Sequence, residues 1–161
     1  MRNWIPLKRV TQLQYGSSLP AEYRTDGPFP VMGSGGKSGT YPHRNTEDPA
    51  IIVGRKGSFG SVHWAPHGAF VIDTAYFADK RRSSVDLRWL FYCLKAIDLK
   101  GPSQDVGVPG LSRDTAHSTK IPPPPPLDEQ RRIADFLDAE TARIDQLAAL
   151  RKEQDASLVK R

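Results

Sequence analysis

The stretch Ile121–Leu137 reads IPPPPPLDEQRRIADFL, in which five consecutive prolines are followed at once by strong helix formers. Proline lacks a backbone N–H, fixes its own φ and keeps the preceding residue out of the helical region, so Pro122–Pro126 should form an extended polyproline II spacer. Asp128 and Glu129 would then place negative charge at the exposed N–H groups of a first helical turn. The sequence therefore predicts three parts: a globular domain over residues 1–120, a stiff linker over 121–127 and a long helix over 128–161.

The segment after the prolines has the pattern of a helix that needs a partner. Residues 128–161 contain no Gly or Pro, and apolar residues recur along a seam with an average spacing of 3.5 positions. At 1.5 Å per residue, such a helix would extend about 50 Å, too far to pack wholly on one small domain. We therefore expect part of the seam to face another helix. The seam residues are Ile133, Leu137, Ile144, Leu147 and Leu158.

Charge is distributed unevenly along the chain. Lys and Arg exceed Asp and Glu by six in residues 1–120, whereas residues 121–161 carry one net negative charge, which together give the overall +5. A positive surplus is typical of phosphate-binding surfaces, but many basic domains bind no nucleic acid.

No apolar run approaches the ~20 residues that a membrane helix needs, and MRNWIPLKRV lacks the apolar centre of a secretory signal. Cys93 is the single cysteine, so the chain can form no internal disulfide. We expect Cys93 to be a buried thiol and the protein to be cytoplasmic.

The pattern over residues 1–120 predicts an α+β domain: a small, irregular mixed sheet with packed helices. Short β-branched and aromatic runs predict strands at Ala50–Val53, Val62–Trp64 and Ala69–Phe77. Apolar residues on one face predict a helix over Val85–Ile97, with Asp86 near its start. Loops or turns are expected at Gly16–Met32, Gly33–Gly39 and Gly101–Gly110, which are rich in Gly, Pro and Ser.

Two glycine-rich basic segments are candidates for contact with phosphates or bases. The segment GRKGSFG at residues 54–60 carries Arg55 and Lys56 on a tight turn, and the guanidinium fork matches guanine or a phosphate. Lys37 lies in GSGGKSG, but Val31 stands where a nucleotide-binding phosphate loop needs its first glycine. An ordinary basic hairpin at residues 54–60 and a solvated corner at residues 80–82 remain open as alternatives.

Signals for catalysis are weak in this sequence. A metal-dependent nuclease could be built from Asp86, Asp98 and Lys100, since two carboxylates and a lysine can hold a metal and activate water. That triplet is common by chance, however, and the four histidines lack metal-ligand spacing. We therefore expect no catalytic residue and no metal. A second alternative is a protein-interaction module whose polyproline run binds an aromatic groove.

Five segments give the chain a resemblance to the specificity (S) subunits of type I restriction–modification enzymes. The resemblance covers nearly the whole chain, and the Pro-Pro-Leu-x-Glu-Gln helix start is its most specific element. A helix seam with Ile133, Leu137 and Ile144 follows that start. The five segments are Trp4–Val10 (WIPLKRV), Tyr15–Leu19 (YGSSL), Pro30–Gly36 (PVMGSGG), Ile51–Gly60 (IIVGRKGSFG) and Pro125–Gln130 (PPLDEQ).

The resemblance implies a non-catalytic subunit that reads one half of a bipartite DNA sequence and docks methyltransferase subunits. Those partners would supply the S-adenosylmethionine chemistry, so no cofactor is expected on this chain, and a motor/nuclease subunit could join for cleavage. A basic target-recognition domain spaced by a stiff helix suits that role. The residues inferred to contact DNA are Lys37, Arg44, Arg55 and Lys56, with Arg81 and Arg82 behind them.

The chain departs from that family in its length. A full S subunit carries two recognition domains and two spacer helices, whereas this sequence has one of each. Two explanations stay open: a natural half-subunit that pairs with itself or with another half, or a truncated gene product. An antiparallel pair would predict an inverted-repeat target with a fixed gap.

Overall fold

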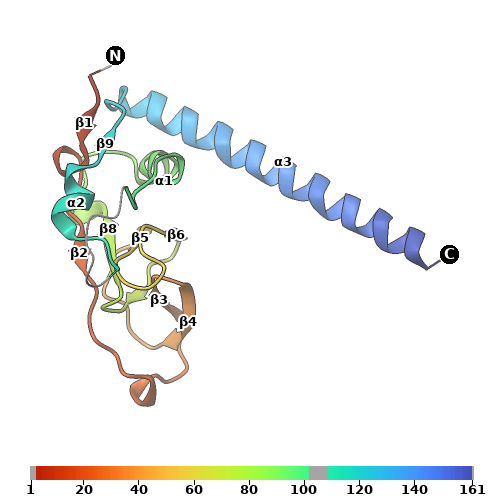
Figure 1. The fold of residues 1–161 in the computed structure, drawn as a ribbon, viewed down its shortest axis with the longest axis horizontal. Helices are drawn as coiled ribbons and strands as arrows, with labels where there is room; N and C mark the ends of the chain where they lie inside the picture. Colours follow the sequence, from red (N-terminus) through yellow and green to blue (C-terminus); the bar gives the residue numbers. More distant parts are fainter. Residues whose placement is uncertain (1–2, 102–108, 161) are drawn as a thin grey trace.

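The computed structural model describes residues 3–101 and 109–160, and it has a globular part from which one long helix projects (Figure 1). The α+β class predicted from the sequence is confirmed. The strands are β1 (Ile5–Pro6), β2 (Gln14–Tyr15), β3 (Phe29–Gly33), β4 (Gly36–Tyr41), β5 (Ala50–Gly54), β6 (Val62–Ala65), β7 (Phe70–Val71), β8 (Ala75–Asp79) and β9 (Lys120–Ile121). The α-helices are α1 (Leu87–Ala96), α2 (Arg113–Ser118) and α3 (Leu127–Val159), and the 3-10 turns are η1 (Leu7–Arg9), η2 (Ala21–Tyr23) and η3 (Lys80–Arg82).

The strands form three sheets, and β5 is an inner strand of the largest. An antiparallel sheet has the order β2-β8-β5-β6, a mixed sheet has the order β4-β3-β7, and β1 pairs with β9. Residues along a strand alternate between its two faces, and β5 uses both. Ile51 and Val53 join an apolar cluster with the residues of α1, whereas Ala50 and Ile52 join a second cluster with β3 and β7. Strand β5 is therefore buried on both of its faces.

Two of the sequence-based predictions in this region are wrong. Residues 69–77 do not form one strand: β7 and β8 belong to different sheets, and the chain turns between them, where Ala75 N–H donates to the Ile72 carbonyl over 3.1 Å. Asp73 and Thr74 favour that turn, although the apolar residues on either side masked it. The predicted loop Gly16–Met32 includes most of β3, whose Val31 is fully buried.

The glycine-rich segment after β3 is a hairpin rather than an extended turn. Its turn consists of Ser34 and Gly35, and the residues from Gly36 to Tyr41 form β4. The β3–β4 register shifts between Pro30 and Met32, an irregularity next to a residue with no N–H to donate. The predicted loop at Gly101–Gly110 falls mostly outside the described residues.

Helix α1 is close to its prediction and carries the cysteine. Asp86 caps it by accepting a hydrogen bond from Trp89 N–H over 2.9 Å, so its carboxylate marks the helix start as expected. One face of α1, including Leu90 and Leu94, is buried in the core. Cys93 is half-buried, and burial raises the pKa of its thiol to about 11, which keeps the sulfur protonated and unreactive.

The start of α3 is fixed to the globular part by a buried glutamine. Ile121 pairs with Ile5 and is fully buried, and α3 begins at Leu127, one residue earlier than predicted. Gln130 is 5% exposed; its Oε1 accepts from Asp86 N–H over 2.8 Å, and its Nε2 donates to the Pro125 carbonyl over 2.7 Å. These bonds tie the proline segment and α1 to the first turn of α3.

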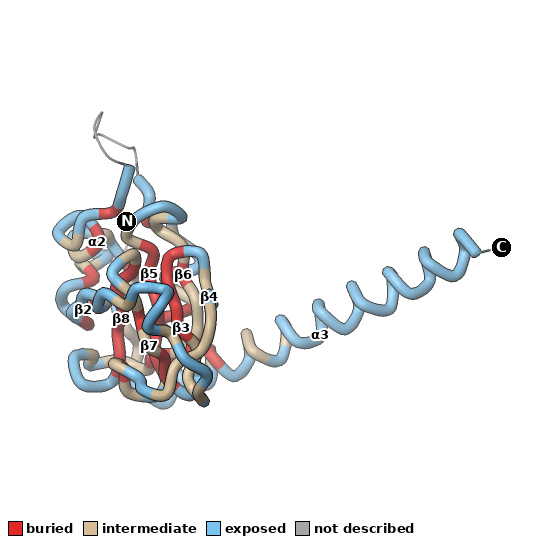
Figure 2. Tube along the Cα trace, turned by 90° about the horizontal axis from the view of Figure 1, so that it is seen from below, coloured by how far each residue is buried: buried red, intermediate tan, exposed pale blue. Residues whose placement is uncertain are grey.

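The predicted seam of α3 divides into a covered part and an exposed part. Ile133 and Leu137 are half-buried near the globular part, whereas the remaining length projects away from it (Figure 2). The seam residues Ile144, Leu147 and Leu158 are 63%, 59% and 69% exposed. Within residues 3–101 and 109–160, no helix combines the length and the apolar character needed to cross a membrane.

Candidate nucleic-acid interface

A groove of about 850 Å³ lies between η1, β2 and η3, and most of its polar lining is basic or amide-bearing. A smaller hollow of about 360 Å³ shares Lys8, Gln12 and Gln14 with it and adds Arg113 and His117 from α2. We call this surface the basic groove. Its polar and aromatic residues used below are Lys8, Arg9, Gln12, Gln14, Tyr15, Arg81, Arg82, Arg113 and His117.

Segments distant in sequence meet at the basic groove through backbone pairing. Gln12 N–H donates to the Arg82 carbonyl over 3.0 Å, and Ser84 N–H donates to the Val10 carbonyl over 2.9 Å. Between them, the Thr11 and Ser83 hydroxyls are 2.7 Å apart. This short ladder places the cations of η1 beside those of η3.

The groove wall at β2 has alternating burial. Leu13 is fully buried, whereas Gln12 is exposed and Gln14 is partly exposed, because successive side chains of an extended chain point in opposite directions. Arg82 Nη1 donates to Gln12 Oε1 over 3.1 Å, and Gln14 Nε2 donates to the Gln12 carbonyl over 3.2 Å. Both amides are thereby held on the groove side of the strand.

Two guanidinium groups lie over the ring of Tyr15, which is 49% exposed. The Cζ atoms of Arg55 and Arg113 lie 5.1 Å and 4.8 Å from the centre of its ring, within the range of cation–π attraction. Arg55 Nη1 also donates to the Asp73 carbonyl over 3.2 Å. A β-carbon at Gly16 would lie 1.9 Å from the Ile72 carbonyl oxygen, so only glycine lets the chain pass this close beyond Tyr15.

An ion pair stiffens the η3 wall. Asp79 is 2% exposed, and its carboxylate accepts from Arg81 Nη2 over 2.6 Å and from Glu47 N–H over 2.9 Å. Burial alone would raise the pKa of Asp79, but the hydrogen bonds from Arg81 and Glu47 outweigh it and lower that pKa. The carboxylate is therefore ionised and its charge is offset by Arg81.

Three of the six cations predicted to contact DNA lie at or beside the basic groove. Arg81 and Arg82 line it, and Arg55 lies over Tyr15. Lys56 follows Arg55 on the turn whose Gly57 has a φ of +70°, and its side chain is exposed.

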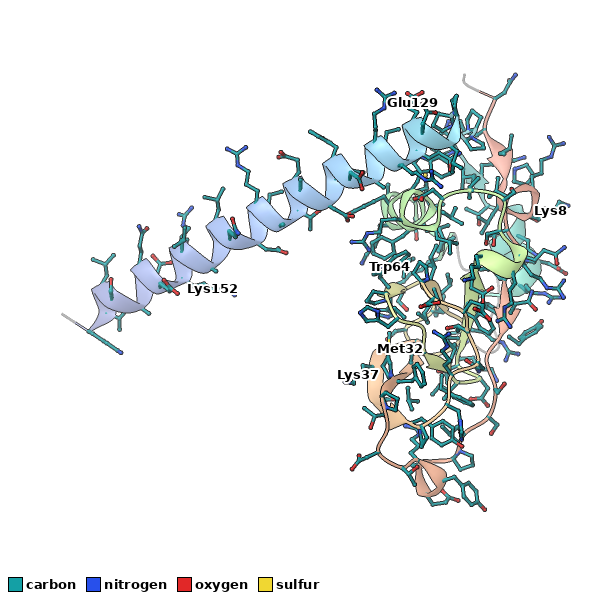
Figure 3. All side chains as sticks on the ribbon, turned by 180° about the vertical axis from the view of Figure 1, so that it is seen from behind. Lys8, Met32, Lys37, Trp64, Glu129 and Lys152 are labelled. Atoms are coloured by element: carbon teal, nitrogen blue, oxygen red, sulfur yellow. The ribbon has the colours of Figure 1, made fainter. Side chains whose placement is uncertain are left out.

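Of the three remaining cations, Arg44 and Lys37 lie elsewhere. Arg44 is exposed, forms an ion pair with Asp48 at 3.6 Å and donates to the His67 carbonyl over 3.2 Å. Lys37 is exposed on β4, on the opposite side of the globular part from Lys8 (Figure 3). The six predicted cations therefore do not form one surface.

Several groove residues were not predicted from the sequence to contact DNA. They are scattered polar residues in the first 15 positions and in α2, which has no strong helix pattern. The alternation of polar and apolar residues from Gln12 to Gln14, with Leu13 buried between the two amides, is a local signal for the two glutamines alone. The missed residues are Lys8, Arg9, Gln12, Gln14, Tyr15 and Arg113.

The nuclease site considered from the sequence does not assemble. Asp86 caps the start of α1, whereas Asp98 follows its end and accepts from Lys100 N–H over 3.0 Å. A helix of ten residues separates the two carboxylates by about 15 Å, too far to share one ion. Among the described residues, no group of three or more His, Cys, Asp or Glu side chains could hold a metal ion.

Three solved structures have the same fold. The S subunit of a type I restriction–modification system from M. genitalium matches with a TM-score of 0.76 and 23% identity, over 88% of this chain and 39% of that chain. A chain from a structure of type I restriction–modification complex assembly and conformational transition matches with a TM-score of 0.74 and 19% identity, over 98% and 43%. The HsdS subunit from Thermoanaerobacter tengcongensis matches with a TM-score of 0.64 and 19% identity, over 90% and 38%.

This chain spans about two fifths of the length of each of these solved chains. No curated protein matches it significantly. Residues 4–154 match the family model of the type I restriction modification DNA specificity domain, in agreement with the resemblance seen in the sequence. Because that match covers nearly the whole sequence, the chain belongs to the type I restriction–modification DNA specificity domain family.

Proposed function

We propose that this chain reads one half of a bipartite duplex DNA sequence as a non-catalytic specificity subunit of a type I restriction–modification complex. The match of residues 4–154 to the DNA specificity domain carries this proposal. The positive surplus of the globular part and the basic groove on it support the same role, since DNA recognition needs cations for phosphates and polar groups for bases.

The proposed protein partners are methyltransferase subunits, which would supply the S-adenosylmethionine chemistry, and a motor/nuclease subunit where the complex cleaves DNA. Helix α3 supports docking because most of its length projects from the globular part with Ile144, Leu147 and Leu158 exposed. We place this assembly in the cytoplasm, where DNA and these subunits would meet.

A second recognition domain would complete the bipartite reading. We propose that the chain pairs with a second copy, or with another half-subunit, through the exposed seam of α3. Two identical copies related by a two-fold axis would read an inverted repeat with a fixed gap. The related solved chains are more than twice as long as the part that this chain matches.

The contact residues inferred from the sequence remain proposals. Arg55 and Arg82 are the best placed of the six, since one lies over Tyr15 and the other lines the basic groove. Arg81 serves mainly to hold Asp79, and Arg44 is engaged by Asp48 and by a backbone carbonyl. Lys37 and Lys56 are exposed and remain available for phosphates.

The test is co-expression with the methyltransferase subunit encoded nearest to this gene. The complex is measured by size-exclusion chromatography with light scattering and is then used to select from a library of randomised duplex DNA. We expect a stable complex and enrichment of one inverted repeat. Absence of both association and sequence enrichment would refute the proposal. Arg55→Ala should weaken binding to the enriched sequence more than binding to random DNA. An equal loss of affinity for both would indicate that Arg55 contacts a phosphate.

A further inference from the structure

We propose that the basic groove is the surface on which the duplex lies, with the amides of Gln12 and Gln14 at base edges and with Lys8, Arg82 and Arg113 at phosphates. This assignment rests on the proposed function and goes beyond it by naming the face of the domain and the role of each side chain. The sequence pointed mainly to the glycine-rich turns at residues 33–39 and 54–60, with Arg81 and Arg82 as further candidates.

The charge of the groove suits a polyanion. Lys8, Arg82 and Arg113 come from η1, η3 and α2 and meet on one surface. The carboxylate that lines the groove is Asp79, which is buried and already paired with Arg81, so it does not repel a phosphate. Arg82 is bonded to a neutral amide oxygen, and its positive charge is therefore not offset by that contact.

The hydrogen bonds of the two glutamines leave complementary groups on the groove side. Gln12 Oε1 is occupied by Arg82, so its Nε2 remains to donate to a base acceptor such as a purine N7. Gln14 uses Nε2 on the Gln12 carbonyl, so its Oε1 remains to accept from an exocyclic amino group of adenine or cytosine. The groove thus presents one donor and one acceptor whose orientation is set before DNA arrives.

The spacing of the two amides also fits stacked base pairs. Residues two apart on an extended chain are separated by roughly 6.6 Å, which is about two base-pair steps of 3.4 Å. We therefore expect Gln12 and Gln14 to read different base pairs. Tyr15, at the end of the same strand, holds the Arg113 guanidinium over its ring and limits the entropy lost when that arginine meets a phosphate.

The first experiment measures binding of the full chain to the selected duplex, by fluorescence anisotropy at several salt concentrations. Lys8→Ala and Arg113→Ala should each weaken binding to every DNA sequence by a similar factor. Each should also reduce the slope of log K against log salt by about one. Lys152→Ala is the matched control, because it removes the same charge from the far part of α3 (Figure 3), and it should bind as the wild type does. A Lys8→Ala variant that behaves like Lys152→Ala would overturn the assignment, and a loss confined to Lys37→Ala would move the interface to β4.

The second experiment repeats the selection with Gln12→Ala and Gln14→Ala. Each variant should lose about tenfold in discrimination at its own base pair while keeping its affinity for random DNA. Both side chains are at least partly exposed, so unchanged thermal unfolding is expected and serves as the folding control. Wild-type specificity in both variants would exclude the amides as base readers.

The outcomes separate this assignment from the proposed function. If the wild-type chain selects one sequence and all groove variants bind DNA as the wild type does, only the assignment of the groove is refuted. A wild-type chain without sequence preference would refute the function and the groove together. Equal competition by an A-form RNA duplex would show that the surface is not specific for DNA, because RNA presents a different groove to the amides.

Discussion

Arg88 Nε donates to Asp138 Oδ1 over 2.8 Å, an ion pair that joins α1 to the projecting helix α3. Tyr92, one turn further along α1, donates its hydroxyl to the same carboxylate oxygen. The Arg88 guanidinium lies 4.7, 4.6 and 5.0 Å from the ring centres of Trp64, Phe91 and Tyr92. The direction in which α3 leaves the globular part is therefore held by a charge pair on an aromatic support.

Removing this carboxylate should loosen the base of α3. Asp138→Ala leaves Arg88 and Tyr92 without their shared acceptor, and because both charged groups are partly exposed, we expect a loss of about 1 kcal/mol. For a chain of this size, the melting temperature should fall by about 2–4 °C. Calorimetry measures the shift, and faster amide hydrogen exchange in residues 133–138 locates it. Asp145→Ala, an exposed carboxylate further along α3, is the control; equal effects of the two changes would contradict the role of the pair.

The buried carboxylate of Asp79 should control acid stability. Its pKa is lowered in the fold, so its contribution is fully present above its ordinary value of about 4 and is lost as the pH falls through the folded pKa. Asp79→Asn should cost about 2 kcal/mol at neutral pH because Arg81 and Glu47 N–H lose a charged acceptor. The variant should also lose less stability than the wild type on acidification. Urea unfolding at several pH values tests both effects, with Asp73→Asn in the exposed turn before β8 as control; parallel pH curves would refute the prediction.

His117 should make the fold sensitive to mild acid. Leu13 N–H donates to His117 Nε2 over 3.0 Å, which requires the unprotonated nitrogen of a neutral ring. Burial lowers the pKa of His117, and the charges of Arg113 and Lys8 lower it further, against a smaller opposite effect of Asp114. The neutral ring therefore stabilises the fold above pH ~6.5, and this contribution is lost as the pH falls through the lowered pKa.

The measurement for His117 compares melting temperatures between about pH 7.5 and about pH 5.5. In His117→Gln, the amide oxygen can accept the same hydrogen bond without titrating, so the decrease on acidification should be smaller than in the wild type. The remaining histidines are common to both proteins and cancel in the comparison. Identical decreases would show that His117 does not titrate in the folded chain over this range.

The exposed seam of α3 should drive self-association. Leu147 is 59% exposed, and burying it against a second helix would contribute about 1.5–3 kcal/mol to the free energy of dimerisation. Leu147→Glu would remove this contribution and add the cost of burying a carboxylate. We expect the variant to weaken dimerisation by more than tenfold in analytical ultracentrifugation, without a change in the melting of the globular part. Ala149→Glu on the other side of the helix should dimerise as the wild type does. A wild-type chain that stays monomeric at about 10 μM would contradict pairing through α3 alone.

The elements predicted correctly are those whose signals are local. The run Ala50–Val53 is apolar throughout because β5 is covered on both faces, and α1 has both an amphipathic pattern and a capping aspartate. Helix α3 follows five prolines and contains neither Gly nor Pro. In each case, a few neighbouring residues are enough to specify the element.

The parts that were missed depend on contacts between distant segments. Strand β3 is stabilised by pairing on both sides, with β4 and with β7, and its own Phe29-Pro30 start resembles a loop. The basic groove brings together Lys8, Arg82 and Arg113, and the bond between Leu13 and His117 spans 104 positions. No local pattern encodes such a meeting, so the sequence indicated a basic domain but not which of its faces is basic.

Because α3 is held only at its base, a small change of angle there displaces its far end by a larger distance. Beyond Asp138, α3 continues for roughly 30 Å, so a tilt of about 10° at its base would move the far end by about 5 Å. That displacement exceeds the ~3.4 Å rise of one base-pair step. In a pair of recognition domains held by such helices, the precision of the gap between half-sites would be limited by the angular stiffness at Arg88 and Asp138, and not only by helix length.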